Sequence, residues 1–337
     1  MSRRLAACVL TAVLVPALAV ALPTARERAP HPAEFSSLPS FVQRVEPAII
    51  GLRVKAAEGA PSSARLGARR FGSAIVFDTR GYAVTVSYAV LDAVSIEAQM
   101  RDGRIVPARL AGIDLDAGLA VVRLEGSGPW PSATLGPSAD VQPGTATGTV
   151  GVDEDNDLVY VTSSVQAVRR FSAFWEYMLE RAFVVAPSIS SWGGSAVVDD
   201  RGRVIGIVSL RLGESPYVNL AIPVEQFMPV KDELIAAGRV VSRRPRPYLG
   251  LHTIAVSGAV FVDGFNDVGP ARAAGFRKGD QIIRVDGVAV MTQEQFYEQM
   301  WRREAGDTIE VAVRRDQQVR VISVRSIDRH LLYPVGQ

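Results

Sequence analysis

The sequence predicts a protein that is dominated by β-strands and divided into at least two folded domains. Between about residues 49 and 222, short runs rich in Val, Ile and Ala alternate with turn sequences such as Asp200-Arg201-Gly202. Many short strands at this spacing are typical of a β-sandwich or β-barrel. The length of 337 residues and the hydrophobic content of 48% are sufficient for more than one core.

Residues 1–22 have the composition of an export signal. Arg3 and Arg4 precede an apolar run from Leu5 to Leu22, which ends in small residues suited to cleavage. The run is also about as long as a minimal membrane span, so an uncleaved amino-terminal anchor is the alternative. We expect a cleaved signal peptide and a periplasmic protein.

A predicted tether and three predicted helices lie before, within and after the strand-rich region. Residues 23–37, rich in proline and charge, predict a disordered tether. Helical spacing of apolar residues predicts helices at Leu38 to Val45 and at Val224 to Gly238, the second with a glycine cap. Residues 171–183 carry five apolar side chains that would share one helical face, so we expect a helix there, either packed on the core or in contact with a partner.

Three motifs within the strand-rich region point to a known family. GYAVTVSYAV at 81–90, DLDAGLAVV at 114–122 and SWGGSAV at 191–197 stand in the order and spacing of the HtrA/Deg family of trypsin-like serine proteases, which the chain resembles. The resemblance implies a chymotrypsin-like double β-barrel over residues 38–242, divided near Gly126 to Pro143.

The same resemblance implies where catalytic residues would stand, and all three are replaced. The family's histidine falls on Tyr88, its aspartate on Gly118 and its nucleophilic serine on Trp192, while an oxyanion-hole glycine falls on Ser190. A phenol is a poor base at neutral pH, glycine orients nothing, and an indole cannot attack a carbonyl. We therefore predict an inactive barrel, a pseudoprotease without catalytic residues.

An active HtrA-type serine endopeptidase in periplasmic protein quality control is the alternative. Four serines lie near the expected nucleophile position: Ser188, Ser190, Ser191 and Ser195. All three histidines lie outside the barrel segment: His31, His252 and His330. A serine without a nearby base is a weak nucleophile, which argues against this alternative. For Trp192 we expect packing in the vacated catalytic space; a plug or stacking platform over the old cleft is the other interpretation.

Residues 246–329 resemble a PDZ domain (α+β) of the bacterial, protease-attached type. Residues 269–287, GPARAAGFRKGDQIIRVDG, match the most specific segment of that family. The resemblance implies that an extended peptide adds to a sheet edge while its terminal carboxylate binds backbone N–H groups. The carboxylate-binding loop would consist of Tyr248, Leu249, Gly250 and Leu251.

A helix in this domain is expected to set ligand specificity. Thr292 and Gln295 have the spacing of a capping box. Phe296 and Met300, four residues apart, would line the groove and select protein or peptide C-termini with apolar ends. The alternative is that Leu249 and Leu251 are core residues and that the groove is empty or occupied by another segment of the chain.

Composition argues against several other classes of function. Without residues 1–22 the chain keeps 35 basic and 35 acidic side chains, which gives no field for nucleic acid or an anionic membrane. Cys8 is the single cysteine, so the mature chain has no thiolate site, and we expect no metal and no cofactor. The run from Arg243 to Arg246 is interpreted as a solvated linker.

The resemblance also implies oligomers. Proteases of this type commonly form trimers through their amino-terminal region, so a homotrimer or a structural role in a mixed protease oligomer is a further hypothesis. Phe35 and Phe41 are the candidate contacts, with local packing as the alternative.

Overall fold

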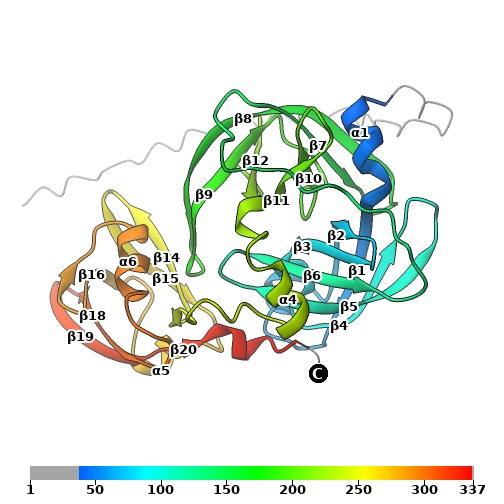
Figure 1. Ribbon diagram of the computed structural model, residues 1–337. Helices are drawn as coiled ribbons and strands as arrows, with labels where there is room; N and C mark the ends of the chain where they lie inside the picture. Colours follow the sequence, from blue (N-terminus) through cyan, green and yellow to red (C-terminus); the bar gives the residue numbers. More distant parts are fainter. Residues whose placement is uncertain (1–37, 336–337) are drawn as a thin grey trace, which may run out of the picture.

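The computed structural model describes residues 38–335 and contains two closed β-barrels followed by an α+β domain (Figure 1). The first barrel is ordered β1-β2-β3-β6-β5-β4 and the second β10-β11-β12-β9-β8-β7. The strands of the first are β1 (Ile49–Ala56), β2 (Arg69–Asp78), β3 (Tyr82–Val86), β4 (Ala93–Gln99), β5 (Ile105–Asp114) and β6 (Leu119–Leu124). Those of the second are β7 (Ala146–Val152), β8 (Leu158–Ala173), β9 (Tyr177–Ala186), β10 (Ala196–Val198), β11 (Val204–Leu212) and β12 (Val218–Pro223).

The third domain is a sheet with the order β14-β15-β16-β18-β19, on which β17 pairs with β16. Its strands are β14 (Leu251–Val256), β15 (Ala259–Phe265), β16 (Gln281–Val285), β17 (Val288–Ala289), β18 (Thr308–Arg315) and β19 (Gln318–Arg325). A separate pair, β13 (Pro247–Tyr248) and β20 (Ile327–Asp328), joins the two ends of the domain. The fold is therefore the predicted chymotrypsin-like double barrel followed by a PDZ domain.

Short helices complete the three bodies. They are α1 (Ser40–Val45), η2 (Glu46–Ala48), α2 (Ser63–Leu66), α3 (Ser87–Val90), η3 (Val224–Gln226), α4 (Lys231–Ala237), α5 (Ala271–Ala274), α6 (Gln293–Met300) and η4 (Arg329–Leu332). The single helix predicted from Val224 to Gly238 is instead divided into η3 and α4, but its predicted end and the predicted start of α6 are confirmed. Gly238 ends α4 with a left-handed φ of 72°, and the Thr292 hydroxyl accepts a hydrogen bond from the Gln295 backbone at the start of α6.

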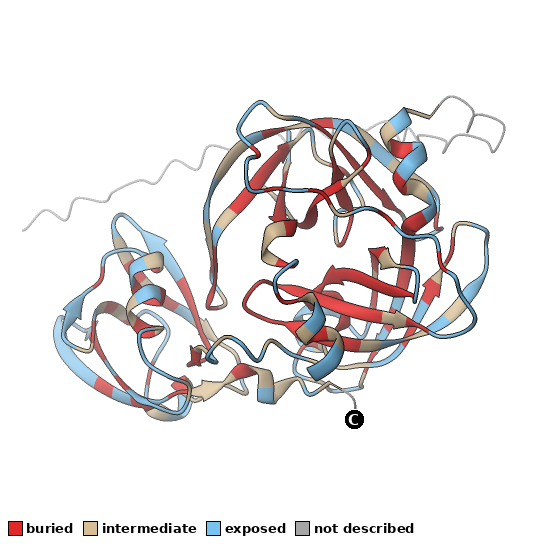
Figure 2. Ribbon diagram, viewed as in Figure 1, coloured by how far each residue is buried: buried red, intermediate tan, exposed pale blue. Residues whose placement is uncertain are grey.

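Burial follows the barrel geometry (Figure 2). All five residues of β3 are buried, because a strand at the junction of the barrels is covered on both sides, whereas β19 alternates exposed and buried positions in its second half. One large buried cluster spans both barrels, and a second occupies the PDZ domain. Phe41 packs locally, since a Cβ added at Gly148 would lie 2.0 Å from its ring. Phe35 lies outside the described residues.

The predicted helix at 171–183 is wrong. This segment forms the end of a long antiparallel hairpin, in which Phe171 pairs with Leu179 and Ala173 with Tyr177. Glu176 turns the chain with a φ of 55°. The apolar side chains of this segment pack against two different bodies, the barrel and the PDZ domain. In the sequence, these two sets together have the spacing of a single apolar helical face. Figure 1 shows the hairpin β8-β9 extending from the second barrel toward the PDZ domain.

Among residues 38–335, no helix has the length and apolar character needed to cross a bilayer. The predicted signal peptide or anchor and the predicted tether fall on residues 1–37, outside the described part.

Candidate functional site

The three positions predicted for a catalytic triad come together at the junction of the barrels. Tyr88 lies on α3, and a Cβ added at Gly193, next to Trp192, would lie 3.0 Å from the Tyr88 hydroxyl. The Gly118 carbonyl accepts a hydrogen bond from the Ser87 backbone at 2.8 Å. The chemistry available at this junction depends on the side chains that occupy it.

Tyr88 is held as a structural hydrogen-bond donor. Its hydroxyl donates to the Ser209 carbonyl at 2.7 Å. Burial raises the pKa of Tyr88 well above its ordinary value, and a hydrogen bond with Trp192 opposes this only in part. The phenol thus stays protonated at neutral pH and cannot act there as a general base.

Trp192 is not a core residue. The residue is 37% exposed, so the prediction that it packs into vacated catalytic space is wrong. The Arg211 guanidinium lies 5.8 Å from its ring centroid and 3.8 Å from that of Tyr217. The guanidinium interacts with the electron-rich faces of both rings, which keeps the indole at the surface.

The space beside Gly118 is filled by Tyr177, the first residue of β9. A Cβ added at Gly118 would lie 2.8 Å from the Tyr177 hydroxyl, and φ at Gly118 is +77°. The Tyr177 hydroxyl donates to the Ala117 carbonyl at 2.8 Å, and the side chain is 4% exposed. Both the backbone angle and the occupied volume therefore disfavour an aspartate at this position.

The serines near Trp192 lack an imidazole partner within the described chain. Ser195 is buried and its hydroxyl donates to the Ser191 carbonyl. The histidines that the structure describes are engaged elsewhere, His252 Nδ1 with Arg65 at 2.9 Å and His330 Nδ1 with Asp328 at 3.0 Å. Across residues 38–335, no three carboxylate, histidine or cysteine side chains are grouped as metal ligands.

The predicted carboxylate-binding loop of the PDZ domain contacts the barrel hairpin. The backbone N–H groups of Leu249 and Leu251 donate to the two carboxylate oxygens of Glu176, at 3.0 and 2.6 Å. Gly250 between them has a φ of +79°, and a Cβ there would meet Gly269 at 2.6 Å. Glycine is thus required by a left-handed backbone in close contact with the next loop.

The remaining predicted groove residues are buried in the PDZ core. Tyr248 and the side chains of Leu249 and Leu251 have little or no exposure, and Phe296 and Met300 on α6 have none. Met178 of β9 belongs to the same cluster. The structure thus brings the predicted loop and helix residues together, and a barrel side chain shares their cluster.

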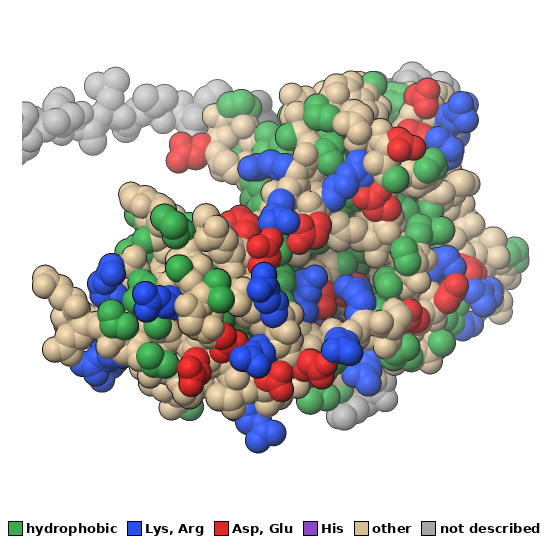
Figure 3. Space-filling model, turned by 60° about the vertical axis from the view of Figure 1, so that its left-hand side comes forward, with side chains coloured by type: hydrophobic (Ala, Val, Ile, Leu, Met, Phe, Trp, Pro, Cys, Tyr) green, Lys and Arg blue, Asp and Glu red, His purple; other side chains and the backbone are tan. Residues whose placement is uncertain are grey.

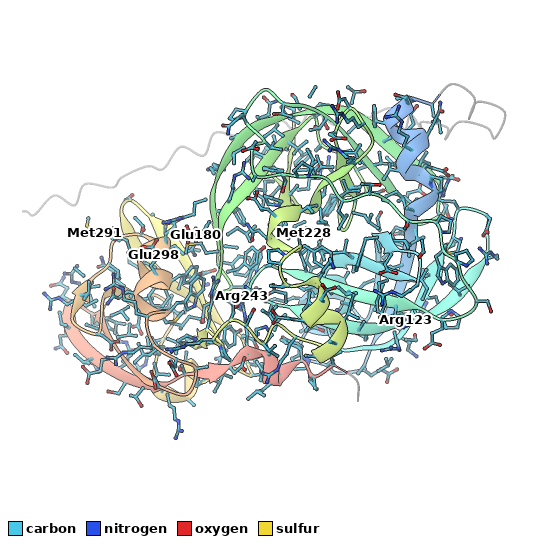
Figure 4. The ribbon with its side chains drawn as sticks, in the orientation of Figure 1. Arg123, Glu180, Met228, Arg243, Met291 and Glu298 are labelled. Carbon is cyan, nitrogen blue, oxygen red and sulfur yellow. The ribbon has the colours of Figure 1, made fainter. Side chains whose placement is uncertain are left out.

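A group of buried and half-buried charges links the hairpin, the linker and the end of the chain. Arg329 of η4 donates to Asp116 at 2.6 Å, to the Leu115 carbonyl at 2.7 Å and to the Glu176 carbonyl at 3.0 Å. Arg243 pairs with Asp114, and the Arg246 guanidinium lies 4.1 Å from the Trp301 ring centroid. Figure 4 shows Arg243 between the two barrels and the PDZ domain.

The interpretation of Arg243 to Arg246 as a solvated linker is therefore wrong for two of its arginines. Burial acts to raise the pKa of Asp116, but the guanidinium groups of Arg329 and Arg246 outweigh it and hold that pKa below its ordinary value. The only sequence signal for this group was the pair Asp114 and Asp116 within the motif around Gly118.

Comparisons with known proteins agree with this architecture. The trypsin-like peptidase domain family matches residues 72–207 and the PDZ domain family residues 247–325. Serine endoprotease DegS of Escherichia coli strain K12 is 26% identical over 295 residues, which cover 82% of this chain and 81% of that protein. The chain belongs to the HtrA/Deg family.

Other members of the HtrA/Deg family give the same picture. Serine protease Do-like HtrA of Lactobacillus helveticus is 24% identical over 277 residues, covering 73% of this chain and 65% of that protein. Among solved structures, the HtrA-type protease AlgW with decapeptide has a TM-score of 0.55 at 22% identity, over 86% of this chain and 97% of that chain. This last similarity bears on the fold alone.

Proposed function

We propose that this HtrA/Deg protein is an exported, periplasmic pseudoprotease that acts by binding protein C-termini through its PDZ domain, as a scaffold, sensor or chaperone-like factor. The observation that carries the proposal is the junction of the barrels. At the position of the family's histidine, the protonated phenol of Tyr88 donates to the Ser209 carbonyl. At the position of the family's aspartate stands Gly118, and Tyr177 fills the space beside it. The mechanism of a serine protease needs an imidazole and an orienting carboxylate at these two places.

Surface charge is consistent with a protein ligand. Figure 3 shows basic and acidic side chains interspersed on the face that it presents. The chain carries a formal charge of +2. Recognition by backbone N–H groups and an apolar pocket therefore fits this protein better than electrostatic attraction to a polyanion.

The test of lost catalysis is digestion of unfolded casein by purified residues 23–337, with trypsin as the positive control. We expect no cleavage. Ser191→Ala and Ser195→Ala variants are assayed beside it. Cleavage that disappears in one of these variants would restore the reading of an active serine endopeptidase and identify its nucleophile.

The test of recognition uses fluorescence anisotropy with labelled decapeptides. We expect binding of a peptide with an apolar last residue and a free terminal carboxylate, and at least about tenfold weaker binding of the same peptide with an amidated end, since the loop N–H groups then lose their anionic acceptor. Equal binding of both peptides would exclude recognition of a C-terminus.

A further inference from the structure

The tip of the β8-β9 hairpin presents a carboxylate to the PDZ loop in the way that a bound C-terminus would. The two Glu176 oxygens accept hydrogen bonds from the Leu249 and Leu251 backbones, and the residue is 1% exposed. The Arg329 guanidinium binds the Glu176 carbonyl at 3.0 Å. A side-chain carboxylate thus fills the position that the family resemblance assigns to a ligand's terminal carboxylate.

Backbone pairing accompanies this contact. Strand β14 is at an edge of its sheet, and the Thr253 N–H donates to the Phe174 carbonyl at 3.0 Å. The Tyr297 hydroxyl of α6 donates to the Ala173 carbonyl at 2.7 Å and accepts from the Glu176 N–H at 3.2 Å. The tip therefore lies between the edge strand and α6, where a peptide would be added to the sheet.

An apolar side chain completes the resemblance to a ligand. Met178 is 4% exposed and belongs to the buried cluster of the PDZ domain, together with Leu249, Leu251 and Met300. Strand β9 contacts α6 directly. The terminal residue of an external ligand would supply both a carboxylate and an apolar side chain. Here Glu176 supplies the carboxylate and Met178 supplies the apolar side chain.

The rim of this contact is charged and more exposed. Arg170 bridges Glu180 on β9, at 2.6 Å, and Glu298 on α6, at 2.5 Å. Figure 4 labels Glu180 and Glu298 close to each other, where β9 approaches the PDZ domain. Exposed pairs of this kind contribute little to affinity, so the buried tip contributes most of the contact.

We infer that residues 173–178 are an internal ligand of the PDZ groove, which an external C-terminus must displace before it binds. The inference rests on the proposed peptide recognition and specifies its regulation. The apparent affinity for an external peptide is then the affinity of the open groove reduced by the fraction of molecules that are open. The internal ligand also indicates the external one, a C-terminus whose last residue is unbranched and apolar.

Occupancy of the groove is tested without any peptide, by hydrogen–deuterium exchange of purified residues 23–337. Peptic fragments that cover residues 247–256 report the N–H groups of Leu249, Leu251 and Thr253. In Glu176→Ala we expect their exchange to accelerate at least about tenfold, and in the isosteric Glu176→Gln by less. Fragments from β18 and β19 should keep their wild-type rates and thereby show that the domain is folded.

Competition is tested by anisotropy with a labelled decapeptide ending in Phe-Trp-Met and a free carboxylate. We expect Glu176→Ala to bind it at least about tenfold more tightly than wild type, and the control Glu214→Ala, an exposed residue of the second barrel, to bind like wild type. Unchanged exchange in Glu176→Ala would overturn the inference. Accelerated exchange without peptide binding by any variant would leave the internal ligand in place and refute the proposed function.

Discussion

Introduction of an aspartate at position 118 tests whether Tyr177 leaves room for a catalytic acid in this barrel. The perturbation is Gly118→Asp. The new Cβ would lie 2.8 Å from the Tyr177 hydroxyl and 3.2 Å from the adjacent ring carbon, on a backbone with φ of +77°. The aspartate must therefore adopt a left-handed conformation and displace a buried tyrosine at the same time.

The expected cost follows from these two terms. A left-handed backbone costs an L-residue about 1–2 kcal/mol, and overpacking of a filled site costs about 1–3 kcal/mol. Together they predict that Gly118→Asp lowers the free energy of unfolding by about 2–5 kcal/mol. Gly144 is a matched control, because its φ is +90° but nothing lies within 4 Å of its added Cβ. Gly144→Asp should lower the free energy of unfolding only by the cost of the left-handed backbone, about 1–2 kcal/mol.

The assay is urea denaturation followed by tryptophan fluorescence, for both single variants and for Gly118→Asp in the Tyr177→Ala background. Removal of the ring should reduce the added cost of Gly118→Asp to that of the control, about 1–2 kcal/mol. If Gly118→Asp changes stability no more than Gly144→Asp in the wild-type background, the argument from occupied space is refuted. The triple variant Tyr88→His/Gly118→Asp/Trp192→Ser should not digest casein either. Tyr177 occupies the space that the new aspartate needs in order to orient the histidine, and loss of that orientation costs about 10⁴ in kcat.

Three further outcomes are expected. Peptide affinity measured by anisotropy should rise about tenfold between pH 6 and pH 8. Burial in the closed groove raises the pKa of Glu176 to about 7, whereas an exposed glutamate titrates near 4.3. The closed hairpin therefore binds a proton more tightly than the open one, and this stabilisation is lost as the pH rises through 7. Arg329→Met should lower the free energy of unfolding by about 3–5 kcal/mol in urea, because the buried Asp116 loses its hydrogen-bonded guanidinium and keeps only more distant ones, the nearest of which is Arg246 at 3.7 Å, whereas the exposed Arg320→Met should change it by less than about 0.5 kcal/mol. Tyr297→Phe should cost about 1–3 kcal/mol in the same assay, because it leaves a buried carbonyl on the hairpin without its donor.

The charges around Glu176 support the direction of the pH prediction. The Leu249 and Leu251 N–H groups and Arg329 favour the carboxylate, but desolvation is the larger effect on the pKa of Glu176. The neighbouring phenols of Tyr248 and Tyr297 have raised pKa values and stay neutral throughout this range. Burial and Arg65 lower the pKa of His252 to about 4, so this ring is also neutral above pH 6. A peptide's own terminal carboxylate is ionised at both pH values.

The sequence was sufficient for the architecture because strands and turns leave local signals. Turn residues bounded the strands of both barrels, and Gly238 and Thr292 marked helix ends through their own backbone preferences. The segment 171–183 was misassigned because spacing alone does not show how many bodies bury its side chains. Glu176 carried no local signal at all, since a lone acidic residue in a turn is ordinarily solvated.

The half-buried arginines of the linker show the same limit. Arg243 and Arg246 looked like solvated linker residues, and their partners Asp114 and Asp116 lie more than a hundred residues earlier in the chain. Long-range pairing of this kind depends on how the PDZ domain is placed against the barrel, which local patterns do not determine.

Glycine at the predicted acid position and the proposed internal ligand are linked by adjacent residues of one strand and its turn. Tyr177 fills the space beside Gly118, and Glu176, one residue earlier, occupies the carboxylate loop of the PDZ domain. A side chain at position 118 would push Tyr177 away and withdraw Glu176 from the groove with it. Glycine at position 118 is therefore a condition for the proposed internal ligand, and a variant such as Gly118→Asp should open the groove to external C-termini as well as destabilise the barrel.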